Sequence, residues 1–446
     1  MKCEEIRDEM VAYLRCELDA EARKEIDEHL ARCQGCRREL EQAQKLLAKT
    51  LSANESSIVD LADTIIREAV RNGASDIHLD PMREGADVLL RIDGVLRKVR
   101  VLSPQERDAL TTRFKMMGGV SLSENRIPQD GRMQVVSNNE EFDLRLSVVP
   151  FIYGEKVVIR ILNKEIYLPG LQGLGFLPEQ IDAIRMLLKQ PTGVLYISGP
   201  TGSGKTTLLY TLLRELVKPG ISIMTIEDPV EIAIDGVQQA HVDSKSGFTF
   251  ATALRSFLRQ DPDVIMSGEI RDFETLDILT SAAIKGHLVL TGIHTQHAVD
   301  VPQRLLSVGA DPFMVGESMI GVVSNVLARI ICSHCKVEYE PSAEALRWLG
   351  LADMIGKNIF YHGAGCETCQ GTGYKGRTGL HEVLVFSNEI SRMVSARQVD
   401  PNMILRYAIE HGFITMIEVA RKRVLDGTTT AEELFRLGNL ITSGPV

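Results

Sequence analysis

The stretch GPTGSGKTT, residues 199–207, decides the fold of this chain, because it matches the pattern G-x-x-x-x-G-K-[ST]. An apolar segment precedes it and a helix-like segment follows it. The glycines of such a loop let backbone N–H groups turn inward around phosphate oxygens, and the following helix N-terminus adds a favourable partial charge. A plain glycine-rich turn is the alternative, and the strand–loop–helix context argues against it. We predict a phosphate-binding loop made of Gly199, Pro200, Thr201, Gly202, Ser203, Gly204, Lys205, Thr206 and Thr207.

Two side chains of this loop carry defined roles in the pattern. The Lys205 ammonium is expected to reach the β- and γ-phosphates, and the Thr206 hydroxyl is expected to face Mg²⁺. The cofactors predicted here are therefore ATP and Mg²⁺.

The segments around the loop alternate between short apolar strands and helical stretches. The predicted strands cover residues 194–198, 221–226, 264–267 and 287–293. Alternation of this kind predicts an α/β fold with a parallel sheet that carries helices on its faces.

Acidic residues follow two of these strands directly. The segment TIEDPVE contains Glu227, Asp228 and Glu231, and the segment DPDVIMSGEIRD contains Glu269. Carboxyl ends of parallel strands meet at one edge of a sheet, where the phosphate loop also lies. Each acid alone could be a solvated loop residue, but acids on two strand ends favour a role in nucleotide hydrolysis, which needs acids near the metal and the attacking water.

Composition limits the class of protein. The 446 residues suffice for about three domains, and the net charge of −10 disfavours a nucleic-acid motor, which needs clustered Lys and Arg. The first twenty residues carry charges throughout, which argues against a signal peptide, and no apolar run is long enough to span a bilayer. We expect a cytoplasmic protein that reaches the inner membrane only through partners.

The chain divides by pattern into several regions. Residues 58–165 show mixed α/β signals, including an amphipathic helix that ends before Gly73 and hairpins at Asp93-Gly94 and Asn138-Asn139. The expected domains are a helical module at 1–50, a polar linker at 51–57, a first α/β domain at 58–165, and an ATPase domain at 166–446 that contains a zinc subdomain at 328–385 and C-terminal helices at 386–446.

Six of the eight cysteines form three C-x-x-C pairs. The second and third pairs are Cys332/Cys335 and Cys366/Cys369, and two such pairs suit a tetrahedral Zn²⁺ site with no open position. We predict a structural zinc site, because redox pairs would need a thioredoxin-like setting.

The first C-x-x-C pair lies in the segment HLARCQGCRREL, residues 29–40. His29 and Cys33 are four residues apart on one helix face, and Cys36 follows after a turn. A fourth zinc ligand is required, for which Cys3 is preferred and Cys16 is the alternative.

Further segments carry a resemblance to a known family. GPTGSGKTT, TIEDPVE, LRQDPDVIMSGEIRD and GHLVLTGIHT occur in the order seen in type II secretion and type IV pilus assembly ATPases, and SDIHLDP, RIDGVL, RIPQDGR and GEKVVIRIL precede them. The chain resembles this secretion-system protein E family over about residues 58–446. The resemblance implies a RecA-like core, a preceding PAS-like domain and a ring-shaped homo-hexamer. The tetracysteine segment resembles the assembly and secretion branch.

The resemblance also implies roles for single residues. Glu227 would position or deprotonate the attacking water and Glu269 would hold Mg²⁺ through water, although the two roles could be exchanged. Asp228 would belong to the nucleotide site. Two histidines would bracket a strand that senses the γ-phosphate, and four arginines would clamp the nucleotide across domain or subunit boundaries: His287, His294, Arg255, Arg259, Arg132 and Arg145. For Arg132 and Arg145 a surface salt bridge is an equal alternative.

The chain departs from the family pattern at three places. Lys285 replaces a threonine, Gln296 stands within HTQHA where HTNDA is common, and Asn325-Val326 replace a Gln-Arg pair. These departures affect how tightly conformational change is coupled to hydrolysis, but they leave the loop and its acids in place.

The first 48 residues resemble the zinc-binding anti-sigma module. In the secretion family this position docks the motor to an inner-membrane partner, so we expect an adaptor here, stabilised by its metal. Two functions follow: a hexameric ATPase that drives pseudopilus or pilus assembly with inner-membrane platform proteins, or an ATP-gated switch whose zinc module captures a sigma factor or other regulator.

Overall fold

The computed structural model describes residues 25–27, 29–30, 32–33, 35–37, 39–40, 55–137, 140–163, 168–243, 245–356, 360–397 and 399–442. The chain forms two compact units, Met1–Ile166 and Tyr167–Val446, and each is described by itself. Within the described residues, no helix combines the length and apolar character needed to cross a membrane.

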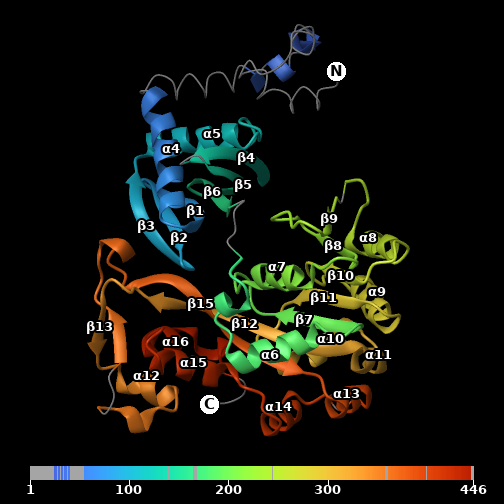
Figure 1. The fold of residues 1–446 in the computed structure, drawn as a ribbon. Coiled ribbons are helices and arrows are strands. Elements are labelled where there is room, and N and C mark those ends of the chain that lie inside the picture. Colours follow the sequence, from blue (N-terminus) through green and yellow to red (C-terminus); the bar gives the residue numbers. More distant parts are fainter. Residues whose placement is uncertain are drawn as a thin grey trace. The chain divides into compact units, whose positions relative to one another are not determined.

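The first unit is built on one antiparallel sheet with strand order β3-β2-β1-β6-β5-β4 (Figure 1). The strands are β1 Ala74–Met82, β2 Gly85–Ile92, β3 Val95–Leu102, β4 Gln129–Ser137, β5 Glu140–Phe151 and β6 Gly154–Asn163. Both predicted hairpins are confirmed, because Ile92 pairs with Val95 and Ser137 pairs with Glu140. Residues 138–139 lie outside the described residues.

Two helices, α4 Glu55–Arg71 and α5 Pro104–Met117, pack on the sheet of the first unit. Ile65 and Ile66 of α4 and Phe114 of α5 form one core with the apolar residues of the strands. The helix α4 begins at Glu55, so the prediction of a linker through residue 57 is wrong at its end. Polar residues are as common in a first helical turn as in a linker, and composition does not distinguish the two.

The second unit contains a seven-stranded sheet with order β15-β12-β7-β11-β10-β8-β9. The strands β12, β7, β11, β10, β8 and β9 are mutually parallel, and β15 is antiparallel to β12. Their bounds are β7 Gly193–Ser198, β8 Ile223–Glu227, β9 Gln238–His241, β10 Val264–Ser267, β11 Leu288–Ile293, β12 Met319–Ile331 and β15 Tyr374–Val385. The predicted parallel α/β sheet is therefore confirmed.

Helices cover both faces of this sheet. Val194 and Tyr196 of β7 lie in one core, while Leu195 and Ile197 lie in the other, so both faces of the strand are buried. Such burial explains why the central strands are apolar without interruption. The helices are α6 Pro178–Leu187, α7 Lys205–Leu216, α8 Phe250–Phe257, α9 Phe273–Ile284, α10 Val301–Val308 and α11 Pro312–Ser318.

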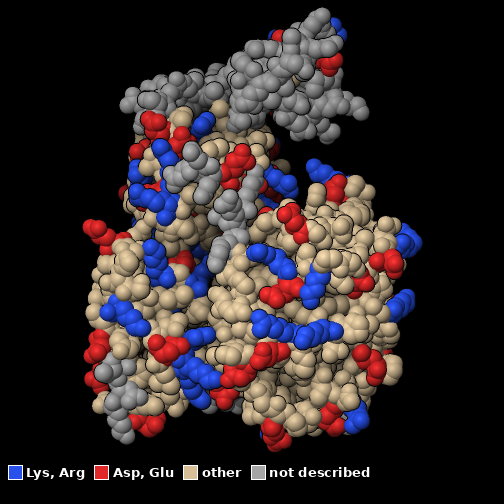
Figure 2. All heavy atoms as spheres, in the orientation of Figure 1, with Lys and Arg blue, Asp and Glu red and all other residues tan. Residues whose placement is uncertain are grey.

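The C-terminal part completes the second unit. A small antiparallel pair, β13 Lys336–Tyr339 and β14 Phe360–Gly363, lies between β12 and β15 in the sequence. The remaining helices are α12 Ala343–Trp348, α13 Asn388–Ser395, α14 Pro401–Glu410, α15 Met416–Leu425 and α16 Ala431–Leu437, with short 3₁₀ turns at Leu171–Leu174, Ala298–Asp300, Ala352–Met354, Glu367–Cys369 and Gly438–Leu440. Basic and acidic side chains are interspersed over the face drawn in Figure 2.

Candidate active site and metal centres

The predicted phosphate loop connects the end of β7 to the start of α7. The helix α7 begins at Lys205, and Gly204 precedes it with a φ of +90°. Gly199 has a φ of +146°, and a Cβ at this position would overlap the carbonyl oxygen of Asn325 and the hydroxyl of Ser203. Only glycine suits such a backbone, so the sequence pattern is explained by the conformation it encodes.

The Lys205 side chain folds back onto its own loop. Its Nζ donates to the carbonyl oxygens of Gly199, at 2.7 Å, and Pro200, at 3.0 Å, and lies 3.5 Å from Nδ1 of His294. Burial lowers the pKa of Lys205, while the negative charge of Glu269 acts in the opposite direction. The ammonium is thus held in place above the loop by weak acceptors that a phosphate can replace.

Glu269 is the acid that faces this lysine. It follows β10, and its Oε2 lies 3.4 Å from Nε2 of His294. Burial alone would raise the pKa of Glu269, but hydrogen bonds and charge from Arg271 and His294 hold this pKa below its ordinary value. The structure therefore brings together Lys205, Glu269 and His294, as the sequence predicts.

Arg271 is a site residue that the sequence analysis missed. Its guanidinium contacts Glu269 and donates to Oδ2 of Asp228 at 2.8 Å, so it bridges the acids that follow two neighbouring strands. It also lies 5.6 Å from the ring centroid of Phe250. The sequence could have indicated Arg271 by its position two residues after Glu269, in the segment GEIRD.

Glu227 lies in a different environment from Glu269. The residue is only 4% exposed, and its oxygens accept hydrogen bonds from Tyr210, from Thr225 at 2.6 Å and from Gln239 at 3.1 Å. Burial and the neighbouring Glu227 carboxylate raise the pKa of Tyr210, which keeps the phenol protonated as a donor. Glu227 is therefore fixed by β8 and its neighbours, while Glu269 is the half-buried acid beside Lys205.

The two predicted histidines lie at opposite ends of β11. His294 follows the carboxyl end of the strand, beside Lys205. His287 precedes the strand, and its Nδ1 donates to the carbonyl of Ala282 at 2.8 Å. About 20 Å of strand separates the two positions. His287 therefore lies at the edge of the sheet opposite the phosphate loop of its own chain, and its role in nucleotide binding stays a prediction.

Arg255 and Arg259 are exposed near the end of α8. Arg255 pairs with Glu274, and Nη1 of Arg259 donates to the Arg255 carbonyl at 2.9 Å. These contacts lie apart from the hydrogen bonds that join Lys205, Glu269 and Arg271. The structure does not bring Arg255 and Arg259 to the loop of their own chain.

Arg132 and Arg145 belong to the first unit and lie directly opposite each other on β4 and β5. Arg145 is in turn opposite Arg160 on β6, whose Nε is 3.1 Å from Oδ1 of the buried Asp76. These arginines line a shallow pocket of about 570 Å³ on this sheet, together with Asp130, Gly131, Leu146, Ser147 and Val158. The pocket is a concentration of positive charge that suits an anion.

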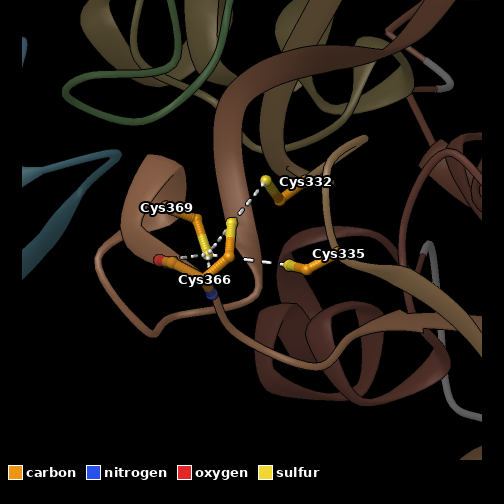
Figure 3. A group of neighbouring side chains, drawn as sticks. All are labelled: Cys332, Cys335, Cys366 and Cys369. Carbon is orange, nitrogen blue, oxygen red and sulfur yellow. Dashed lines mark hydrogen bonds between the residues drawn. The ribbon is translucent and has the colours of Figure 1, made fainter.

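The tetracysteine cluster is assembled as predicted (Figure 3). The Sγ atoms of Cys332 and Cys366 are 3.8 Å apart, and those of Cys369 are 3.7 Å from both Cys335 and Cys366. A tetrahedral zinc with Zn–S bonds of about 2.3 Å requires sulfur atoms about 3.8 Å apart. The four thiols therefore fit Zn²⁺.

Backbone N–H groups support the cluster. Gly365 donates to Sγ of Cys335 at 3.3 Å, and Cys366 and Gly373 both donate to Sγ of Cys369 at 3.2 Å. Burial alone would raise the pKa of Cys369, but the N–H groups of Cys366 and Gly373, with the side chains of Cys366 and Cys335, lower it to about 6, while burial raises the pKa of Cys335. Such donors stabilise thiolates, which is the form that binds a metal.

A second cluster lies near the start of the chain. Side-chain atoms of His29, Cys33 and Cys36 lie within 4.8 Å of one another, as the sequence predicts. Ile26 and Leu30 pack with Cys36 in a small apolar core. Cys3 and Cys16 lie outside the described residues, so the fourth ligand stays a prediction. Three ligands in this arrangement fit Zn²⁺ with one position left for another residue.

Taken together, the second unit presents an ammonium, a half-buried carboxylate and a histidine at one edge of a parallel sheet, next to a helix N-terminus. This arrangement can bind a polyphosphate and support phosphoryl transfer to water. The oxygen donors of Thr206, Asp228 and Glu269 are of the kind that Mg²⁺ prefers.

Comparison with solved structures gives the same fold. The ATPase DotB of Legionella pneumophila aligns with a TM-score of 0.61 and 21% identity, over 84% of this chain and 94% of that one. The DotB of Yersinia pseudotuberculosis gives 0.63 and 20%, over 86% and 94%. The pilus retraction motor PilT gives 0.50 and 24%, over 83% and 98%.

Sequence relatives are more similar. The type IV pilus assembly ATPase PilB of Thermus thermophilus is 43% identical over 88% of this chain and 44% of its own length. The type II secretion system protein HxcR of Pseudomonas aeruginosa is 38% identical over 85% and 77%, and the type II secretion system ATPase E of Vibrio cholerae is 37% identical over 90% and 78%. The chain thus spans under half of the Thermus relative and over three quarters of the other two.

Family comparison covers nearly the whole chain. A zinc-finger family matches residues 3–37, which begin at Cys3 and include the first cluster. The family described as Type II/IV secretion system protein matches residues 52–436. With that match, and with relatives above 30% identity that the chain covers by more than two thirds, the chain belongs to the Type II/IV secretion system protein family.

Proposed function

We propose that this protein is a Mg²⁺-dependent ATPase that powers assembly of a type IV pilus or a type II secretion pseudopilus. The observation that carries the proposal is the group formed by Lys205, Glu269 and His294 at the loop that follows β7. The family relationship and the names of the relatives support the same conclusion.

Different groups of the loop bind the phosphates. Lys205 exchanges the carbonyls of Gly199 and Pro200 for phosphate oxygens, and the N–H groups at the start of α7 point at the same oxygens. Because Lys205 is partly buried, its attraction to phosphate is screened less than that of a surface lysine.

Glu269 is placed to act near the terminal phosphate. Its ionised form faces Lys205 and His294, and Arg271 restrains its carboxylate. Mg²⁺, held by the Thr206 hydroxyl and by the carboxylates of Asp228 and Glu269, would neutralise charge on the phosphates. We infer that Glu269 orients the water or the metal ligands, while Glu227 fixes the backbone of β8 through its three donors.

We propose that the active form is a homo-hexamer on the cytoplasmic face of the inner membrane, docked to platform proteins. Arg255 and Arg259 are exposed, and within the part of the chain that the structure describes they contact Glu274, the Arg255 carbonyl and Ser256. The arginines of the first unit line an anion-sized pocket. Both features suit arginines that complete the site of a neighbouring subunit, where a positioned arginine can raise the rate by about 10³ to 10⁵.

We propose that the zinc module at the start of the chain is the docking adaptor. Its cluster of His29, Cys33 and Cys36 precedes the ATPase region in the sequence, and a module of about 50 residues is too short to be stable without a metal. The second candidate function, a switch in which this module captures a sigma factor or other regulator, is favoured by the zinc-finger match alone.

Copurification separates the two functions. Full-length protein, purified by affinity with and without ATP, is probed for its bound partner, and His29→Ala with Cys33→Ala serves as the control. A membrane platform protein that is lost in the control supports the assembly motor. A transcription regulator bound in the same way, with no platform protein, would contradict it.

A further inference from the structure

The strand β12 forms the floor of the phosphate loop. It lies parallel to β7, with Ser324 opposite Ser198, and the hydroxyls of these two residues are hydrogen-bonded. Asn325 is therefore the residue of β12 that lies beneath the point where the loop leaves the sheet. It is only 3% exposed.

Asn325 contacts the loop at two places. Its side-chain Nδ2 donates to the carbonyl oxygen of Ser203, and its own backbone oxygen lies against Gly199. A Cβ on Gly204 would also meet Nδ2 of Asn325, at 3.2 Å. The first and last parts of the loop thus rest on one residue of a neighbouring strand.

The hydrogen bond to Ser203 fixes the orientation of the peptide that joins Ser203 to Gly204. In a trans peptide, the C=O and the N–H point in opposite directions. With its carbonyl drawn toward Asn325, this peptide turns the Gly204 N–H away from the sheet and toward the side where a phosphate binds. Asn325 therefore aims a phosphate donor without itself reaching the ligand.

The other half of the amide is not satisfied. Among the described residues, Oδ1 of Asn325 has no hydrogen-bond partner, although it is buried. An unpaired buried acceptor costs free energy, and an apolar side chain of similar shape would avoid this cost. Fold stability alone does not favour an amide here, so the benefit of the amide lies in the order it gives to the loop.

We propose that Asn325 is a positioning residue of the phosphate loop and sets the affinity for the polyphosphate end of the nucleotide. The proposal rests on the proposed function, because it assumes that the loop binds ATP.

The test uses the full chain and a fluorescent ATP analogue with Mg²⁺. Asn325→Ala removes the donor, and Asn325→Leu removes it while keeping the branched shape of the side chain. Val326→Ala is the matched control, because Val326 is equally buried on the same strand but packs in the C-terminal core. We expect both Asn325 variants to bind about tenfold more weakly, the effect of one lost hydrogen bond, and the control to bind like the wild type.

Kinetics distinguish positioning from general damage. Loss of positioning raises KM with little change in kcat, while partial unfolding lowers kcat and leaves KM unchanged. The proposal is overturned if the Asn325→Leu protein keeps the wild-type affinity and KM. It is also overturned if Val326→Ala, with the same melting temperature as the Asn325 variants, loses the same affinity for the analogue. If the wild type itself fails to bind the analogue, the proposed function fails and the result is distinct from these.

Discussion

Two glutamates at neighbouring strand ends show how environment assigns roles to identical residues. Glu227 is almost fully buried and accepts three hydrogen bonds, while the side chain of Glu269 is 29% exposed and faces Lys205 and His294. The sequence places both acids correctly but leaves their roles exchangeable, because strand-end position does not reveal which donors surround a carboxylate.

This difference predicts distinct phenotypes for the two acids. Glu269→Gln should retain ATP binding and lose at least about 100-fold in turnover, as is usual when a preorganised group near the transferred phosphate is removed. Glu227→Gln should instead lower the melting temperature, because its NH2 group replaces one of the two acceptor oxygens and so meets either the Tyr210 hydroxyl or the Gln239 amide, each of which donates to Glu227. Measurements of turnover and thermal unfolding for both variants test this prediction. Unchanged turnover in Glu269→Gln would contradict the catalytic role of Glu269.

Replacement of Arg271 should change the pH dependence of ATP turnover. It helps to hold the pKa of Glu269 below its ordinary value, so Arg271→Gln should raise that pKa. Less Glu269 is then ionised in mildly acidic solution, and the acidic limb of the rate profile should move to higher pH.

Arg271→Lys is the control for this change, because it keeps the positive charge. It should leave the acidic limb nearer to that of the wild type. If the limb stays fixed in Arg271→Gln, the ionisation of Glu269 does not govern turnover.

At the scale of elements, the short apolar strands and the phosphate loop can be predicted from the sequence, whereas the strands β12 and β15 cannot. The strands β7, β8, β10 and β11 are short apolar runs between turn signals, so the sequence indicates them directly. The strands β12 and β15 are long and interrupted by polar residues, and their pairing joins segments about fifty residues apart. Only the folded chain shows that Asn325 lies beneath the loop.

The metal content of the tetracysteine cluster can be tested by replacing one of its cysteines. We expect one Zn²⁺ at this cluster and one at the cluster of His29, Cys33 and Cys36. Cys366→Ser should lower the zinc content by one per chain and lower the melting temperature, because β12 and β15 lose a shared anchor at their ends.

Elemental analysis and thermal unfolding of Cys366→Ser check this expectation. Ser307→Ala offers a control, because Ser307 is exposed and its hydroxyl, among the residues that the structure describes, donates to the Arg304 carbonyl of its own helix. Wild-type zinc content in Cys366→Ser would exclude the cluster as a metal site.

At the scale of the whole molecule, the division into two compact units separates the nucleotide machinery from the start of the chain. The loop, Glu269 and His294 all lie in the second unit. A chain that starts at Leu51, just before α4, should therefore fold and bind ATP but fail to capture the partner of the full-length protein. Loss of ATP binding with partner capture retained would show that the first residues belong to the motor.

The central claim is that this chain hydrolyses ATP at the loop that begins at Gly199. The most direct test is the Mg²⁺-dependent rate of phosphate release from ATP by the full-length chain and by Lys205→Ala, with Lys189→Ala as the control because Lys189 is exposed just after the end of α6. The account predicts turnover by the wild type and the control, and a loss of at least about 100-fold in Lys205→Ala. Wild-type turnover by folded Lys205→Ala would contradict it.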